Sequence, residues 1–316
     1  IGYPSRADEV RMVTAISQGR TASDFDLSAV QRRFVIRAPE GMSVGYGVAP
    51  GYPEVHHLDP AQGQALQSVV AQALRDGQIS ASPILARRSG GDSAGRRVLL
   101  RVQGDFEDAE LLWDRQSGKV ERLNTRFADT EKTLSPTVPF EFKSSDGRAI
   151  AGYLIRPRGA KGPVPLVVDI HGGPWLRDHW SPATYNARQL LANRGYAVMQ
   201  VNYRGSSGYG TAFRAAGFRQ WGGVMQDDVT DAAHWVISQG YADPQRMCIL
   251  GWSYGGYAAL MGAVKTPDLF KCAVATAPVA NMDRLYDELA WIRAKNYNRD
   301  RIFGEGPAQP LLNSPV

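Results

Sequence analysis

The sequence predicts an α/β fold with a mostly parallel, doubly wound sheet, preceded by a region of antiparallel β structure. From about residue 163 onward, short apolar runs alternate with helical stretches, which is the pattern of repeated strand–helix–strand units. Continuous β-branched and apolar runs are typical of strands that are buried on both faces of a sheet. The predicted strands are Val164–Ile170, Ala197–Val201, Met247–Leu250 and Cys272–Thr276, and the predicted helices are Thr184–Asn193, Val224–Gln239, Tyr257–Val264 and Met282–Lys295.

The N-terminal part of the chain has a different pattern, in which short alternating runs are separated by Gly, Asp and Ser, as in antiparallel sheets. The predicted strands there are Ile79–Ala86, Arg97–Val102, Glu110–Asp114 and Lys119–Leu123, with a hairpin turn at Gln116–Gly118 and an amphipathic helix at Ala61–Arg75. We therefore divide the chain into residues 1–135 and residues 136–316. The second part opens with a hairpin that turns at Asp146 and Gly147.

The composition is that of an ordinary globular chain and excludes several classes of protein. The 316 residues suffice for two cores, and 43% of them are hydrophobic. The net charge is +5, but the basic residues occur in scattered pairs, so we expect no nucleic-acid partner. No apolar run approaches the ~18 residues of a membrane span, so we expect no membrane partner. Cys248 and Cys272 lie in apolar runs, which favours two buried thiols over a disulfide or a metal site.

A candidate catalytic serine lies between a predicted strand and a predicted helix. Residues Gly251–Gly255 read Gly-Trp-Ser-Tyr-Gly and match G-x-S-x-G, the nucleophile elbow of the α/β-hydrolase fold. The turn needs small neighbours because side chains there would clash where the strand meets the helix. We therefore predict Ser253 as the nucleophile. The alternative is a glycine-rich turn with a serine that has no chemical role.

A second motif, His171–Pro174, follows the predicted strand Val164–Ile170 and reads His-Gly-Gly-Pro. Acyl transfer needs preorganised N–H donors for the oxyanion, and a loop without side chains brings a backbone amide against the substrate. We predict the amides of Gly173 and Tyr254 as these donors, with a plain glycine turn as the alternative. His171 is not predicted as the base, because it precedes the nucleophile and the order in α/β-hydrolases is serine, acid, histidine.

Two further groups of residues could be mistaken for ligand sites. The loop Asn202–Gly210 has neither the G-x-G-x-x-G nor the Walker spacing, which disfavours a phosphate site. Asp227, Asp228 and Asp231 stand early in a predicted helix, where they fit N-terminal dipole partners and ion-pair acceptors better than metal ligands. We expect no cofactor and no metal.

These motifs, in this order and spacing, resemble the prolyl oligopeptidase family of serine peptidases, in its acylaminoacyl-peptidase and dipeptidyl-aminopeptidase-like branch. The resemblance covers Pro136–Val316 well and rests on His171–Pro174, Asn202–Gly210 and Gly251–Tyr257. It implies an α/β-hydrolase catalytic domain at 136–316 and a partial β-propeller-like cap at 1–135. It also implies that short peptides are cleaved through a serine acyl-enzyme, and a carboxylesterase or a non-catalytic binding protein of the same fold are the alternatives.

The sequence departs from the family pattern after the nucleophile. The five histidines are His56, His57, His171, His179 and His234, and none follows Ser253. The family's catalytic Asp and His come later in the chain, so we expect that this chain lacks them and is inactive by itself. The N-terminal part is long enough for roughly three propeller blades at ~40–45 residues each, fewer than the smallest ordinary propeller.

The resemblance also places the pocket for the residue before the scissile bond just after Ala277 and Pro278. It points to Val279, Met282 and Leu285, with Tyr254 as a wall, and a plain core role is the alternative for these residues. Met282 stands where proline-specific relatives tend to carry an aromatic residue, which favours a broader apolar pocket. We expect a cytoplasmic location, with a periplasmic or secreted one left open, and the sequence is compatible with a homo-oligomer.

Overall fold

The structure, a computed structural model, divides into two compact units. It describes residues 33–37, 43–48, 51–52, 54–57, 60–79, 85–126, 132–183, 186–288, 295–303 and 314–315. The first unit comprises residues 1–137 and 180–187, and the second comprises residues 138–179 and 188–316. Residues 180–187 cluster with the first unit although they lie between two strands of the second.

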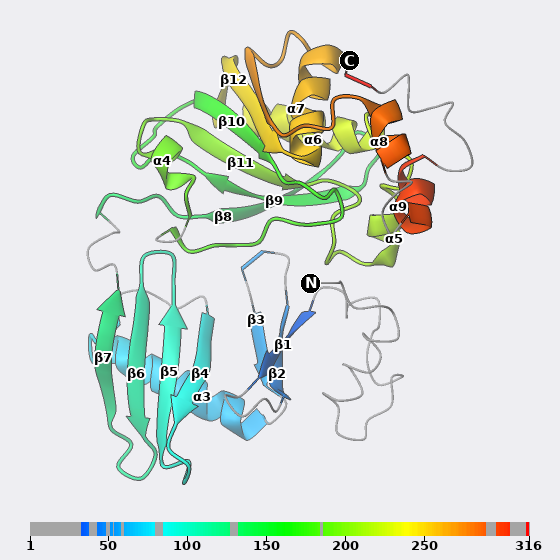
Figure 1. Cartoon of the computed structure of the whole chain (residues 1–316). Coiled ribbons are helices and arrows are strands. Elements are labelled where there is room, and N and C mark those ends of the chain that lie inside the picture. Colours follow the sequence, from blue (N-terminus) through cyan, green and yellow to red (C-terminus); the bar gives the residue numbers. More distant parts are fainter. Residues whose placement is uncertain are drawn as a thin grey trace. The chain divides into compact units, whose positions relative to one another are not determined.

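The second unit is built on a six-stranded sheet with the order β13-β12-β10-β11-β9-β8 (Figure 1). Strand β10 pairs in parallel with β11 and β12, and β12 pairs in parallel with β13. The hairpin β8–β9 adds two antiparallel strands beside β11. The strands are β8 Val138–Lys143, β9 Ala149–Ile155, β10 Val164–Ile170, β11 Ala197–Asn202, β12 Ala242–Trp252 and β13 Cys272–Thr276.

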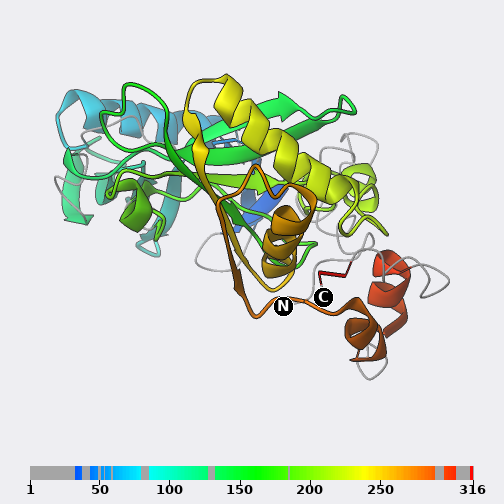
Figure 2. The same cartoon turned by 90° about the horizontal axis from the view of Figure 1, so that it is seen from above.

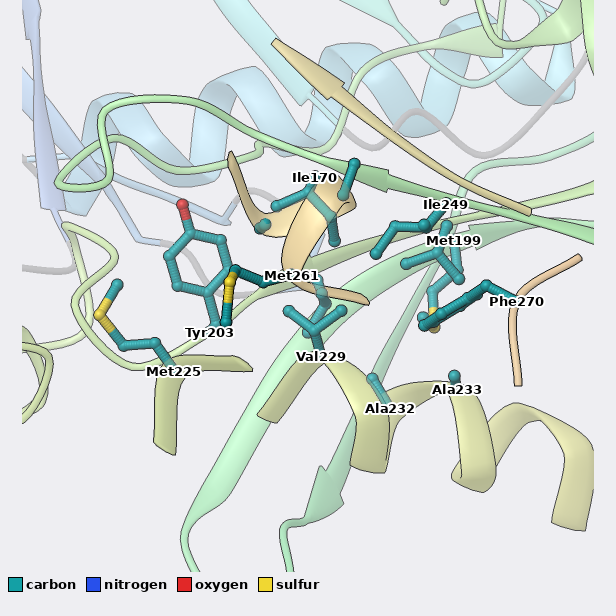
Figure 3. Packing of buried hydrophobic residues seen from close by; sticks show 14 of the residues in the cluster. Ile170, Met199, Tyr203, Met225, Val229, Ala232, Ala233, Ile249, Met261 and Phe270 are labelled. Carbon is teal, nitrogen blue, oxygen red and sulfur yellow. The ribbon is translucent and has the colours of Figure 1, made fainter. Parts of the chain in front are cut away.

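Helices α6 (Val224–Ser238) and α7 (Tyr254–Lys265) form the core of this unit together with the sheet (Figure 2). Apolar residues recur along α6 at helical spacing, which gives the helix one buried face. Figure 3 shows Val229, Ala232 and Ala233 of α6 pointing toward Met199 and Ile249 of the sheet. The other helices are α4 Gln189–Ala192, α5 Thr211–Ala215, α8 Met282–Glu288 and α9 Lys295–Ile302.

The first unit contains an antiparallel four-stranded sheet with the order β4-β5-β6-β7 and a three-stranded sheet β1-β2-β3. Helix α3 packs on the four-stranded sheet, because its buried residues Val69, Val70 and Ala73 share one apolar cluster with strand residues such as Leu100 and Leu111. The antiparallel region is as predicted, whereas a β-propeller is not established. The elements are β1 Arg33–Arg37, β2 Ser43–Val48, β3 Glu54–His57, α3 Pro60–Arg75, β4 Leu85–Gly91, β5 Arg97–Gln103, β6 Asp108–Asp114 and β7 Val120–Arg126.

Some predicted elements differ from the observed ones. The predicted strand Ile79–Ala86 is wrong at its start, since Ile79 follows the end of α3 and β4 begins at Leu85, with residues 80–84 outside the described part. Of the predicted helix Thr184–Asn193, the structure has Gln189–Ala192 as α4, and residues 184–185 lie outside the described part. Of the predicted helix Met282–Lys295, only Met282–Glu288 is described as α8, and residues 289–294 lie outside the described part. No helix among the described residues is long and apolar enough to cross a membrane.

The expectation of two buried thiols is wrong, because Cys248 and Cys272 form a disulfide. The two residues are direct partners in the parallel pairing of β12 and β13, so both side chains leave the sheet on the same face with their Cα atoms 4.7 Å apart. Cys272 is exposed, since β13 is the edge strand of the described sheet and every second residue of it faces away from α7. The strand register that creates the pair is invisible in the one-dimensional pattern.

Candidate active site

Ser253 occupies a strained turn between a strand and a helix. Strand β12 ends at Trp252 and helix α7 begins at Tyr254, so the strand–turn–helix geometry expected of the motif is present. Ser253 has φ 58° and ψ −119°, a combination that costs a residue with a side chain of order 1–3 kcal/mol. The side chain is partly exposed, as a nucleophile must be.

The flanking glycines are required by close packing of the turn. A Cβ built on Gly251 would lie 2.3 Å from the carbonyl carbon of Gly255, and one on Gly255 would lie 2.0 Å from the carbonyl oxygen of Ile170. Real Cβ atoms do not make such contacts, so any other residue would push the helix off the sheet. The glycines therefore seat α7 directly against β10 and β12.

The loop that follows β10 lies against the serine. A Cβ built on Gly172 would lie 3.6 Å from the Cβ of Ser253 and 3.0 Å from the carbonyl oxygen of Trp252. Gly173 has φ +123° and is followed by a cis peptide bond to Pro174. Tyr254 is the first residue of α7, and the first amides of a helix have no acceptor within the helix. The structure thus brings together the serine, the glycine loop and a helix N-terminus.

His171 precedes this loop and is bonded to neighbouring groups. Its Nε2 lies 2.9 Å from the hydroxyl oxygen of Ser206, and its ring stacks on Tyr203 with the centroids 4.4 Å apart. Burial lowers the pKa of His171 to about 4, so the imidazole is neutral at ordinary pH. These contacts agree with the expectation that His171 is not the base for Ser253.

The acidic residues of α6 accept ion pairs and hydrogen bonds. Asp228 is fully buried and binds the guanidinium of Arg204 through both oxygens, at 2.8 and 2.6 Å. Asp227 pairs with Lys265 at 3.1 Å, and Asp231 accepts a hydrogen bond from the amide of Ser145 at 2.7 Å. The prediction that they are ion-pair acceptors is confirmed for Asp227 and Asp228. No cluster of three or more potential metal ligands occurs among the described residues.

A cavity of about 390 Å³ lies on the sheet face that carries the side chain of Asp169. Its polar lining includes Asp169, whose carboxylate binds Arg188 at 2.5 Å, while Leu250, Trp252 and Val274 supply apolar lining. Burial raises the pKa of Asp169, and Arg188 opposes the shift. Trp252 is 66% exposed and Val274 53% exposed, so this face is apolar and open among the described residues.

The predicted pocket residues lie together at the start of α8, and one of them is buried in the core. Met282 is 1% exposed and belongs to the main apolar cluster, against which Val279 and Leu285 pack half-buried. Tyr254 is also buried, with its hydroxyl 3.9 Å from the sulfur of Met225. The expectation that Tyr254 is a pocket wall is therefore wrong, because its ring lies in the core beneath the elbow.

Sequence reasoning gave no role to Tyr203, Arg204 or Asp178, which the structure places around the same loops. Asn202 binds both backbone groups of Asp178, and Tyr203 and Arg204 follow it directly. The sequence did mark the loop Asn202–Gly210 as a motif. It could not show the contacts of that loop, because its partners lie in segments that are distant along the chain.

The sheet order, the strand–turn–helix at Ser253 and the glycine loop are those of an α/β-hydrolase fold. A family model described as the prolyl oligopeptidase family matches residues 182–303. The resemblance of the chain to this family, in the branch of dipeptidyl aminopeptidases and acylaminoacyl peptidases, is thereby confirmed.

Curated relatives and solved structures agree with this family. Dipeptidyl aminopeptidase BIII of Pseudoxanthomonas mexicana is 43% identical over 182 residues, which are 55% of this chain and 26% of that protein. Dipeptidyl peptidase family member 6 of Caenorhabditis elegans is 34% identical over 194 residues, 54% of this chain and 26% of that protein. The structure of a puromycin-hydrolyzing peptidase of Mycobacterium tuberculosis matches with TM-score 0.57 and 29% identity, covering 70% of this chain and 35% of that one. The chain thus spans about a quarter of the length of these curated relatives.

Proposed function

We propose that the protein is a serine peptidase that hydrolyses short peptides through an acyl-enzyme on Ser253. The observation that carries the proposal is the strained backbone of Ser253, with φ 58°, held against the loop of Gly172 and Gly173. Strain of this kind persists only where the surrounding structure enforces it, and it presents the hydroxyl above the sheet.

In the proposed reaction, the Ser253 hydroxyl oxygen attacks the peptide carbonyl carbon and its proton passes to a general base. The carbonyl oxygen becomes an oxyanion that accepts hydrogen bonds from the amides of Gly173 and Tyr254. The C–N bond then breaks, the amine leaves with the proton returned by the base, and the acyl group remains as an ester on Ser253. Water hydrolyses this ester by the same steps and restores the hydroxyl.

We assign the base to a residue outside the described part of this chain. His171 is engaged with Ser206 and Tyr203, and His234 lies on the exposed side of α6. His179 has its pKa lowered to about 4, chiefly by desolvation, so it is a weak proton acceptor. A histidine and an orienting acid are needed to complete the triad.

The substrate class is inferred from the relatives and from the apolar residues near the elbow. The relatives' names describe dipeptidyl aminopeptidases and a puromycin-hydrolyzing peptidase. Val279 and Leu285, which are half-buried against the core, are suited to contact an apolar side chain before the scissile bond, with the buried Met282 behind them in the core. We also propose that the sheet β4–β7 is one blade of a propeller-like cap, since four-stranded antiparallel sheets are the units of propellers.

The Cys248–Cys272 disulfide is informative about the cellular compartment of the protein. Disulfides persist in oxidising compartments and are rare in the cytosol. The pair Cys248–Cys272 therefore favours a periplasmic or secreted location over the cytoplasmic one expected from the sequence. Alkylation of free thiols in cells before lysis tests this: protection of both cysteines supports the proposal, and full labelling of both contradicts it.

The function is tested with the full-length protein that contains this chain. A fluorophosphonate probe should label the wild type and leave Ser253→Ala unlabelled, and the Ser253→Ala variant should lose turnover of dipeptidyl p-nitroanilides by about 10⁶-fold. Matched p-nitrophenyl esters and anilides separate a peptidase from a carboxylesterase. Turnover confined to esters would replace peptidase by esterase, and an unlabelled wild type would indicate a non-catalytic protein.

A further inference from the structure

Two loops of the second unit, which we call the hydrolase unit, are joined by several hydrogen bonds. We call residues His171–Asp178 the oxyanion loop and residues Asn202–Gly210 the clamp loop. At one end the hydroxyl of Tyr203 donates to the carbonyl oxygen of His171 at 2.9 Å. In the middle the amide of Ser207 donates to the carbonyl oxygen of Leu176 at 2.9 Å. At the other end the side chain of Asn202 accepts from the amide of Asp178 at 2.7 Å and donates to its carbonyl oxygen at 3.1 Å.

Tyr203, His171 and Ser206 form a closed ring of contacts at the catalytic end of these loops. The hydroxyl of Tyr203 lies 3.1 Å from Nδ1 of His171 as well as 2.9 Å from its carbonyl oxygen. Nε2 of His171 lies 2.9 Å from Oγ of Ser206, and that hydroxyl is 2.7 Å from the carbonyl oxygen of Tyr203. Tyr203 is fully buried and stacks on the imidazole at 18° between the ring planes.

The clamp loop is itself anchored to the core. Tyr203 directly follows β11, and the next residue, Arg204, is fixed by Asp228 of α6 through its backbone amide at 2.8 Å and through its guanidinium. Arg204 also binds Asp146 in the turn between β8 and β9, at 2.6 Å. The side chain of Tyr203 therefore projects from a backbone segment that β11 fixes on one side and the contacts of Arg204 fix on the other.

The oxyanion loop needs such an external restraint. Glycine has more backbone freedom than any other residue, and Gly172 and Gly173 follow each other directly. Oxyanion stabilisation depends on donors that are oriented before the reaction, and a misplacement of about 1 Å costs of order 10² in rate. The bond from Tyr203 to the His171 carbonyl fixes the peptide plane immediately before Gly172, and through it the direction of the Gly173 amide.

We propose that Tyr203 is a positioning residue, which orients the oxyanion amide of Gly173 through His171 without touching the substrate. The inference rests on the proposed function and assigns a role to a motif that the catalytic steps leave unused. It follows that loss of the Tyr203 hydroxyl should impair the transition state more than substrate binding, because only the developing oxyanion uses the oriented amide.

The test compares Tyr203→Phe with Tyr241→Phe in the full-length protein. Tyr241 is the control because of its position. Its backbone carbonyl oxygen accepts a hydrogen bond from the amide of Val164, so it lies at the start of β10, and the oxyanion loop follows the other end of that strand. Reacted sites are counted by fluorophosphonate titration, so that misfolded protein does not enter the rate. We expect Tyr203→Phe to lower kcat about 10- to 100-fold with KM within about twofold, and Tyr241→Phe to change neither.

Binding of a peptide aldehyde separates positioning from a merely structural role, since its tetrahedral adduct places an oxyanion where the substrate does. The affinity for the peptide aldehyde should fall in Tyr203→Phe in proportion to kcat. In a second test, His171→Gln, which keeps polar groups in the side chain, should retain more activity than His171→Phe. A wild type that hydrolyses peptides beside a Tyr203→Phe variant with unchanged kcat would overturn the inference alone. A folded wild type that neither hydrolyses peptides nor reacts with the probe would overturn the proposed function.

Discussion

Burial decides the charge of the side chains around the oxyanion loop. His171 lies against Tyr203, and desolvation lowers the pKa of its imidazole to about 4. Asp178, at the other end of the same loop, has its pKa raised to about 6 by desolvation, which Arg188 and Gln200 oppose. Both groups thus shift toward the neutral form, as expected where water is excluded. The hydrogen bonds from Tyr203 to the His171 carbonyl and between Asn202 and the backbone of Asp178 involve no charged group.

The raised pKa of Asp178 makes a stability prediction with a definite sign. In the unfolded chain the carboxyl has a pKa near 3.8, so the folded state binds the proton more tightly and loses stability as the pH rises through about 4 to 6. Asp178→Asn removes this cost. We expect the thermal midpoint to rise by a few °C at pH 8 and to change little at pH 4, measured by scanning calorimetry. A midpoint that falls at pH 8 would show that the attraction to Arg188, at 3.7 Å, outweighs desolvation.

Gly173 is predicted to be intolerant of a side chain for a local reason. A Cβ there would lie 2.7 Å from the amide nitrogens of Trp175 and Leu176, at a φ of +123°. Gly173→Val, and more mildly Gly173→Ala, should lower kcat by about 10² or more with a smaller change in KM, because the amide loses its orientation. Gly159→Ala is the matched control, since Gly159 has φ +75° but no atom within 4 Å of its Cβ position. Equal kcat in Gly173→Ala and wild type would place the oxyanion donor elsewhere.

Among the elements, those with unmistakable local patterns were predictable from the sequence. Strands β10 and β13 have the predicted bounds, since both are rich in β-branched and apolar residues. Strand β12 begins at Ala242, five residues before the predicted start. Ala242 pairs with Val164 before a register shift, and the sequence pattern of Asp243 and Pro244 is typical of a turn, so this part of the strand was not predicted.

What the sequence could not reveal depends on contacts between distant segments. The Cys248–Cys272 disulfide requires the register of β12 against β13, and the ring of Tyr203, His171 and Ser206 requires two loops 32 residues apart to meet. Neither register nor loop contact leaves a period in the sequence. The candidate nucleophile was predictable because the elbow is built from consecutive residues, whereas the residues that position its surroundings are not consecutive.

Helix α6 carries two neighbouring carboxylates whose energetic roles should differ widely. Asp228 is fully buried against Arg204, while the Asp227 side chain is 48% exposed and pairs with Lys265. Removing one partner of a buried ion pair typically costs 3–5 kcal/mol, whereas exposed pairs contribute about 0–1 kcal/mol. We expect Asp228→Asn to lower the thermal midpoint by several degrees and Asp227→Asn to leave it nearly unchanged.

The variants Asp228→Asn and Asp227→Asn should also differ in catalytic rate. Because Asp228 fixes the backbone of Arg204, Asp228→Asn should lower kcat per fluorophosphonate-reactive site, and Asp227→Asn should not. Equal thermal midpoints for the two variants would contradict the assignment of α6 as the anchor of the clamp loop.

At the scale of the whole molecule, the hydrolase unit holds the candidate nucleophile and the proposed oxyanion amides, but no histidine of the unit is suited to act as their general base. Ser253, the glycine loop and the N-terminus of α7 come together within this unit. Of the three histidines of the unit, His171 contacts Ser206, His234 lies on the exposed face of α6, and desolvation lowers the pKa of His179 to about 4. A serine hydroxyl is a weak nucleophile unless an adjacent base takes its proton.

We therefore predict that the 316-residue chain, expressed by itself, hydrolyses peptides far more slowly than the full-length protein that contains it. Loss of the base alone typically lowers turnover by about 10⁶-fold, and the oxyanion donors retain only a residual 10³–10⁴-fold acceleration over water. Both proteins are assayed side by side on an aminoacyl or dipeptidyl p-nitroanilide, with His179→Ala in the isolated chain as control. Comparable rates that disappear in His179→Ala would identify His179 as the base, and the assignment of the base to residues outside the described part would be wrong.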